Sequence, residues 1–177
     1  MPGPWAGRSP PIDAELCKKR RTMKQDETAL VKQALRDARE QLERGVRVMP
    51  GAYMLVTLNP QTGAPLMHPT AIGAQRDQPF ESRRDYSEFC DTLRAEALRL
   101  KAIAVVLAGE AEAEIETTRG AERRRVLYVR VEDDAGVHQM HAPIESSSGR
   151  TRLGSLLADP EAPDEVEQRL LPGRQSS

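Results

Sequence analysis

The sequence predicts an α+β fold in which two helices pack on a mainly antiparallel sheet of about five strands, in the order α-β-β-α-β-β-β. Two segments carry apolar residues at helical spacing, and a long stretch from 103 to 144 alternates apolar and polar residues with a period of two. A chain of 177 residues fits a single domain with tails. We place that domain at residues 26–145.

Composition limits the functional classes that the chain can serve. The chain is 38% apolar and 30% charged with a formal net charge of −1, which is typical of a soluble globular protein and argues against general attraction to nucleic acid. The longest apolar run, residues 102–108, is far shorter than the roughly 20 residues of a membrane-spanning helix. No secretory signal is recognisable, so we expect a cytoplasmic protein whose Cys17 and Cys90 are free thiols. No metal site or cofactor is expected.

Residues 1–25 are rich in proline and carry no apolar period, which predicts a disordered tail. The tail contains the basic run Lys18, Lys19, Arg20 and Arg21, which either contacts nucleic acid or an acidic partner or is simply solvated. Met23 opens the first patterned segment, so residues 1–22 could also precede the true start of translation.

The first patterned segment is an amphipathic helix that begins near Asp26 and ends before Gly45. Its apolar stripe consists of Val31, Leu35, Ala38 and Leu42. Residues 52–58 follow as a central strand because they are apolar on both faces and rich in β-formers. The turn at 59–63 leads into a partner strand at 66–72, which Pro69 confines to the edge of the sheet, and residues 73–84 are expected to form a loop.

A second helix is predicted after this loop. Asp85 and Glu88 have capping-box spacing, and an apolar stripe follows them. Its members are Phe89, Leu93, Ala97 and Leu100. Cys90 lies beside that stripe, so a buried structural thiol is favoured over a nucleophile.

The segment from 103 to 144 predicts a three-stranded antiparallel meander. Odd positions are apolar along most of it, whereas the even positions from 110 to 116 are all glutamate. A loop at 117–123 and a turn at 133–136 separate the three strands. This loop predicts a register in which Glu116 lies opposite Arg124, Glu112 opposite Tyr128 and Glu110 opposite Arg130. The following hairpin sets Arg130 opposite Gln139 and Tyr128 opposite His141, with His138 inward beside Val131.

Two polar rows would then cross an exposed outer face, and two interpretations of them stay open. The rows are Glu110–Arg130–Gln139 and Glu112–Tyr128–His141, and Glu116 and Arg124 extend the charged surface. Opposite charges across strands can simply keep a half-exposed sheet soluble. Alternatively, Glu112, Tyr128 and His141 could form a general-base row, provided that they lie within hydrogen-bond reach under a cover. No other signature of catalysis or of metal binding is present in the sequence.

The ends of the domain suggest self-association and a mobile tail. Ala104, Val106 and Ala108 make the even face apolar at one end of the sheet, where either the first helix or a second copy of the chain must cover it. A homodimer through this patch or through the edge strand is therefore one hypothesis.

Residues 146–177 are rich in Ser, Gly, Pro and charge and predict a flexible tail, with one short helix from Asp164.

The segments AVVLAGEAEAEI, RRVLYVRVEDDAG and HAPIE resemble small uncharacterised proteins of bacterial and phage genomes. Those proteins combine a long helix with an apolar strand that ends in an acidic stretch, followed by an Arg-led strand. The resemblance covers residues 85–145 and implies a shared fold without an activity. The sequence as a whole favours a non-catalytic accessory protein that presents a charged sheet face or edge to a protein partner or to itself. A small hydrolase-like enzyme and a nucleic-acid contact through the tail are the alternatives.

Overall fold

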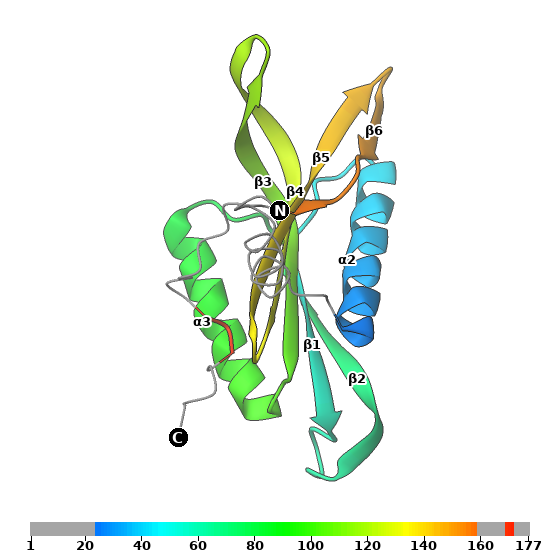
Figure 1. Ribbon diagram of the computed structural model, residues 1–177, viewed down its shortest axis with the longest axis vertical. Coiled ribbons are helices and arrows are strands. Elements are labelled where there is room, and N and C mark those ends of the chain that lie inside the picture. The colour runs from blue at the N-terminus through cyan, green and yellow to red at the C-terminus, as the bar shows by residue number, and fades with distance from the viewer. Residues whose placement is uncertain (1–23, 159–168, 172–177) are drawn as a thin grey trace, which may run out of the picture.

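The computed structural model describes residues 24–158 and 169–171 and confirms the α+β class (Figure 1). The five expected strands are present, and two short strands follow them. In chain order the elements are α2 (Gln25–Glu43), β1 (Gly51–Leu58), β2 (Pro65–Gln75), α3 (Arg83–Leu100), β3 (Ala104–Thr117), β4 (Gly120–Asp133), β5 (Gly136–Ser147), β6 (Arg150–Leu153) and β7 (Leu157–Ala158).

The strands form one antiparallel sheet in the order β2-β1-β3-β4-β5-β6, and β7 pairs with Met140 and His141 of β5. The two helices cover opposite faces of this sheet (Figure 1). Leu30, Ala34 and the rest of the α2 stripe pack on one set of β3 residues, including Val106, whereas Leu93 and Ala97 of α3 pack on the other set, including Val105. The centre of the sheet is therefore buried on both sides.

The helix ends follow from local chemistry. α2 stops before Gly45, whose φ of 74° lies in the left-handed region that glycine enters without strain. The N-cap of α3 is Ser82 and not Asp85: the Ser82 hydroxyl accepts a hydrogen bond from the Asp85 amide at 3.1 Å. Asp85 instead forms a bidentate ion pair with Arg76, at 2.8 and 3.0 Å, which anchors the preceding loop to the first turn.

The β1–β2 hairpin confirms the predicted central and edge strands. The Asn59 side chain accepts hydrogen bonds from the amides of Gln61 and Thr62 and so closes the turn. β2 runs on to Gln75, so the connection to α3 is shorter than the expected loop at 73–84. β2 is the last strand on its side of the sheet.

The predicted register between β3 and β4 is wrong. A turn of two residues, Thr118 and Arg119, joins these strands in place of a long loop, so that Thr117 pairs with Gly120. Every partner shifts by three residues: Glu110 lies opposite Leu127, Glu112 opposite Arg125 and Glu116 opposite Ala121. A shift by an odd number exchanges the faces. The even residues of β3 therefore share a face with the odd residues of β4.

The predicted register between β4 and β5 is confirmed. Arg130 lies opposite Gln139, Tyr128 opposite His141 and Val131 opposite His138. The turn at 133–136 also forms as expected, with the Asp133 carboxylate accepting the amides of Ala135 and Gly136. This face of β4, with Tyr128 and Arg130, is not an open outer surface, because Arg130 is 2% exposed.

The ordered fold continues past residue 145, where the domain was expected to end. β5 extends to Ser147, and a tight turn at Ser148 and Gly149, with φ of 52° and 74°, brings β6 back beside it. Leu170 and Leu171 are also buried in the core under α3. The short helix expected from Asp164 and the basic run Lys18–Arg21 lie outside the described residues. No helix in the described ranges is long and apolar enough to cross a membrane.

Candidate functional site

The predicted catalytic row does not assemble. Tyr128 and His141 are cross-strand neighbours, but the residue on the other side of Tyr128 is Gly109. Glu112 lies three positions away along β3, opposite Arg125, and is exposed. A carboxylate that orients the imidazole beside the phenol is therefore missing from this row, and the structure gives no support for the general-base interpretation.

The charged residues of the predicted binding face are separated into different environments. Glu110 pairs with Arg125 and Arg47, whereas Arg130 pairs with Glu132. Arg124 forms its ion pair with Glu122 of the same strand, at 3.0 Å, and not with Glu116. Gln139 is half-buried beside Arg130, and Glu116 is exposed near the tip of the β3–β4 hairpin. These residues do not form one continuous charged face.

Tyr128 and Arg130 belong instead to a polar cluster beneath α3. Tyr86 and Cys90 of α3 reach this cluster, and Cys90 is fully buried. Burial raises the pKa of the Cys90 thiol, and the opposing effects of Tyr86 and Arg130 do not cancel it. Burial likewise raises the pKa of Tyr128, which also lies beside Tyr86. A neutral buried thiol next to neutral phenols has a structural role rather than that of a nucleophile.

Glu132 is the deepest carboxylate of the same face, with 0% exposure. It accepts four hydrogen bonds: from Arg130 Nη2 at 2.8 Å, from Arg169 Nε at 2.8 Å, and from the amides of Leu170 and Leu171 at 2.9 Å each. A buried carboxylate is tolerated only where such donors replace water. Three of the four donors come from the C-terminal segment 169–171.

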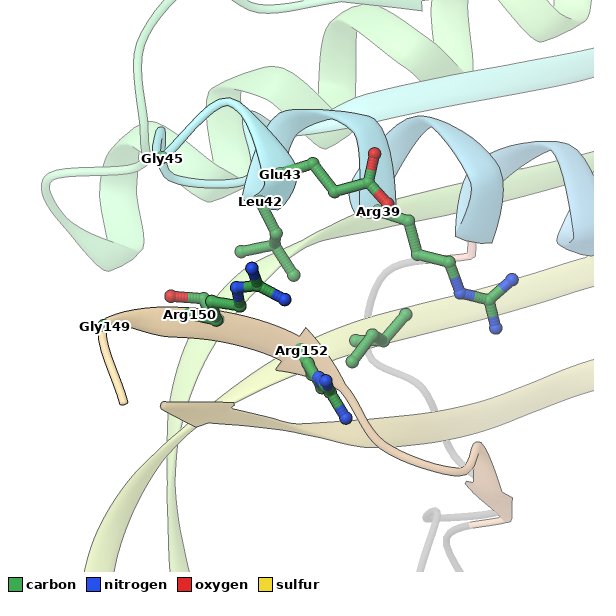
Figure 2. A pocket seen from close by; sticks show the side chains of 9 residues that line it. Arg39, Leu42, Glu43, Gly45, Gly149, Arg150 and Arg152 are labelled. Carbon is green, nitrogen blue, oxygen red and sulfur yellow. The ribbon is translucent and has the colours of Figure 1, made fainter. Parts of the chain in front are cut away.

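One surface site was not anticipated from the sequence. A cleft of about 550 Å³ lies between the C-terminal half of α2 and β6, and arginines from both elements line it (Figure 2). We call it the arginine cleft. Its lining consists of Arg39, Leu42, Glu43, Gly45, Gly149, Arg150, Thr151, Arg152 and Leu153.

The charge of the arginine cleft is unbalanced. Figure 2 shows Arg39 on the helix side and Arg150 and Arg152 on the strand side of the cleft. Glu43 is the only carboxylate in the lining, so the cleft carries an excess of positive charge. Within the described residues, none of the three arginines has a carboxylate at ion-pair distance. Their guanidinium donors are therefore available to a ligand.

An adjacent hollow of about 380 Å³ provides an internal comparison. It shares Leu42, Gly45 and Thr151 with the arginine cleft, and its own arginines are Arg47 and Arg125. Both of these arginines are paired with Glu110, at 3.3 and 2.6 Å. The fold thus neutralises the arginines on one side of Leu42 and leaves those on the other side unneutralised.

A sequence signal for the arginine cleft did exist. Ser148 and Gly149 form a turn signal, and the alternating Arg150 and Arg152 that follow it are typical of a short strand with both arginines on one side. The composition of residues 146–177 concealed this hairpin. Across the described part of the chain, no group of His, Cys, Asp and Glu side chains could hold a metal ion.

Comparisons with models of protein families, with curated proteins and with solved structures find no match.

Proposed function

We propose that the protein is a non-catalytic interaction protein that binds an acidic segment of a partner protein in the arginine cleft. The observation that carries this proposal is that Arg39, Arg150 and Arg152 all line one cleft and have no carboxylate partner among the described residues. The net charge of the whole chain is −1, so this basic character is local. A local basic site selects a matching acidic group and not polyanions in general.

Guanidinium groups suit carboxylate ligands for geometric reasons. Each presents a rigid fork of donors that binds a carboxylate through two parallel hydrogen bonds. Three forks on two facing elements can hold two or more acidic side chains in a defined spacing. Leu153, which is half-buried, adds apolar surface to the lining, which an aliphatic side chain of the same segment could contact.

The lining favours a peptide over a nucleic acid. Proteins that bind single-stranded nucleic acid stack bases on aromatic side chains, and the cleft contains no aromatic residue. The separation of Glu112 from Tyr128 and His141 supports a binding role over the hydrolase alternative. A cytoplasmic location completes the proposal, and the free buried thiol of Cys90 supports it.

Fluorescence anisotropy with a labelled acidic peptide, of alternating glutamate and leucine, tests the proposal. We expect saturable binding that weakens with salt, and a loss of about ten-fold or more in affinity in the Arg150→Ala/Arg152→Ala variant. Arg119→Ala/Arg123→Ala is the matched control, because it removes two exposed arginines from the β3–β4 hairpin.

Two further probes separate the alternatives. Deleting residues 1–22 leaves peptide affinity unchanged if the arginine cleft is the site, and lowers it if the Lys18–Arg21 run is the site. A labelled oligothymidine of equal charge should bind more weakly than the peptide. Tighter binding of the oligothymidine, or an equal loss of affinity in both arginine variants, would contradict the proposal.

A further inference from the structure

The C-terminal segment 169–171 occupies a site that is built like a peptide-recognition site. It lies far along the chain from its contacts, which are on α3 and at the end of β4. Its side chains and its backbone are both bound. Arg169 donates to the Glu132 carboxylate at 2.8 Å and to the Asp133 carbonyl at 2.7 Å, and the Arg169 carbonyl accepts from Arg94 Nε at 2.6 Å.

The two leucines complete the recognition. Their amides donate to the two carboxylate oxygens of Glu132, one to each oxygen, at 2.9 Å. Their side chains are 1% and 4% exposed and belong to the core cluster that includes Cys90 and Leu93 of α3. The fully buried Glu132 carboxylate therefore binds one arginine side chain and two consecutive backbone amides. The apolar core cluster under α3, which we call the apolar bed, packs against the two leucine side chains.

This arrangement specifies a ligand. Without the segment, only Arg130 of these four donors would remain, and the Glu132 carboxylate would need other donors in place of the three that were lost. Any replacement must supply a guanidinium, two adjacent free amides and two bulky apolar side chains in that order. An arginine followed by two leucine-like residues meets these requirements. A lysine does not, because its ammonium group lacks the planar fork of donors with which Arg169 binds both the Glu132 carboxylate and the Asp133 carbonyl.

We infer that the Glu132 docking site, formed by Glu132, Arg130, Arg94, Cys90 and Leu93, is a recognition site for an arginine–leucine–leucine segment of a partner protein. Residues 169–171 occupy it in cis, and the partner segment binds in their place. The site is on the α3 side of the sheet and the arginine cleft is on the α2 side, so this inference does not rest on the proposed function.

Competition with the chain's own segment sets the expected affinities. A tethered segment acts at an effective concentration on the order of millimolar, so it masks the site from a free peptide of the same sequence. Weakening the internal segment should unmask the site. We therefore expect a labelled peptide with the sequence of residues 166–173 to bind the full-length Arg169→Ala/Leu170→Ser chain about ten-fold or more tighter than the native chain.

The experiment is a fluorescence anisotropy titration of that peptide, with circular dichroism to verify that each chain is folded. Peptides that carry Arg169→Ala or Arg169→Lys are the matched ligands, and both should lose most of the affinity. Because they alter only the peptide, they leave the fold of the protein untouched. If the double variant does not fold, the full-length Arg169→Ala chain, which retains both leucines, takes its place.

Two results would overturn the inference. One is the absence of saturable binding at millimolar peptide to a folded variant chain, which would mean that the segment is only a structural closure. The other is equal affinity for the native and the Arg169→Ala peptides, which would mean that the apolar bed captures leucines without recognition by Glu132. Neither result bears on binding of acidic peptides in the arginine cleft.

Discussion

The Glu110 carboxylate holds the Arg125 guanidinium through two hydrogen bonds, at 2.6 and 3.0 Å, diagonally across β3 and β4. The same carboxylate accepts from Arg47 Nε at 3.3 Å and from the Val48 amide at 3.1 Å. Glu110 therefore fastens the connection between α2 and β1 to the middle of the sheet. Its side chain is 2% exposed, so these donors replace its water.

Replacing Glu110 by glutamine should destabilise the fold by about 1–3 kcal/mol near pH 7, since it removes charge-assisted hydrogen bonds and leaves Arg125 without its carboxylate. Burial alone would raise the pKa of Glu110, but the hydrogen bonds from Arg125 and Val48 and the nearby arginine charges outweigh it and lower the pKa below 4.5. Urea unfolding of both chains measures the difference.

The pH dependence of that difference has a definite sign. Because the folded pKa is lowered, the stabilisation is complete above the ordinary carboxyl value of 4.5 and is lost as the pH falls through the lower folded value. The native chain and the Glu110→Gln variant should therefore converge in acid. Glu112→Gln, at an exposed position opposite Arg125, is the control and should change stability little. A difference that stays constant down to pH 3 would contradict the assignment.

The thiol of Cys90 should be almost inert in the folded protein. It is fully buried under α3, and burial raises its pKa, so little thiolate is present or accessible near pH 8. In a Cys17→Ser background, alkylation by iodoacetamide should be at least about 100-fold slower in buffer than in denaturant. Mass spectrometry measures the extent of alkylation over time. Fast alkylation of the native chain would contradict this prediction and would show that the α3 side opens readily.

The sequence was informative wherever a pattern had a local cause. Residues 133–136 form the turn that Asp133 and Gly136 predict, and the pairing of Tyr128 with His141 follows directly from that turn. The apolar stripe of each helix also identified the buried side, and α2 covers Ala104, Val106 and Ala108 in place of a second copy. Local turn chemistry and helical period thus determine most of the fold.

The sequence failed where the result depended on a length or on a distant element. Because residues 117–123 were expected to form a loop, the predicted pairing of β4 with β3 was shifted by three residues. The prediction therefore set Glu112 opposite Tyr128, whereas Glu112 lies opposite Arg125. The period of two in β3 was real, but it could not reveal that α3 covers the face of β4 that carries Tyr128 and Arg130. The contact of Glu132 with residues 169–171 spans 37 to 39 positions, and no local pattern predicts it.

The N-cap of α3 offers a simple test of local stability. The Ser82 hydroxyl accepts the Asp85 amide, so Ser82→Ala leaves a helix amide without its acceptor and should cost about 1 kcal/mol. Ser155→Ala, at an exposed position outside any helix, is the matched control and should be neutral. Thermal unfolding followed by circular dichroism compares them. Equal stability of both variants would indicate that the Arg76–Asp85 pair alone positions this helix end.

The outer edge of β2 is the surface from which we expect self-association. β2 ends the sheet, no strand of the described residues pairs with its outer side, and residues 65–75 contain no Lys, Arg, Asp or Glu. Edge strands in monomeric proteins are usually protected by such charges or by proline, because an unpaired row of backbone groups is a template for another strand, and β2 has Pro65 and Pro69 but no charge. Met67, with 94% exposure, adds apolar surface to this edge.

We therefore expect the native chain to dimerise with increasing concentration through antiparallel pairing of β2 with β2 of a second copy. Thr70→Lys places a charge on this exposed strand and should weaken the dimer by about ten-fold, because a charged edge strand disfavours pairing with another strand. Gln61→Lys, in the neighbouring turn, adds the same charge without altering the strand. Sedimentation equilibrium measures all three chains. A strictly monomeric native chain at high concentration, or equal weakening by both lysines, would remove β2 as the contact.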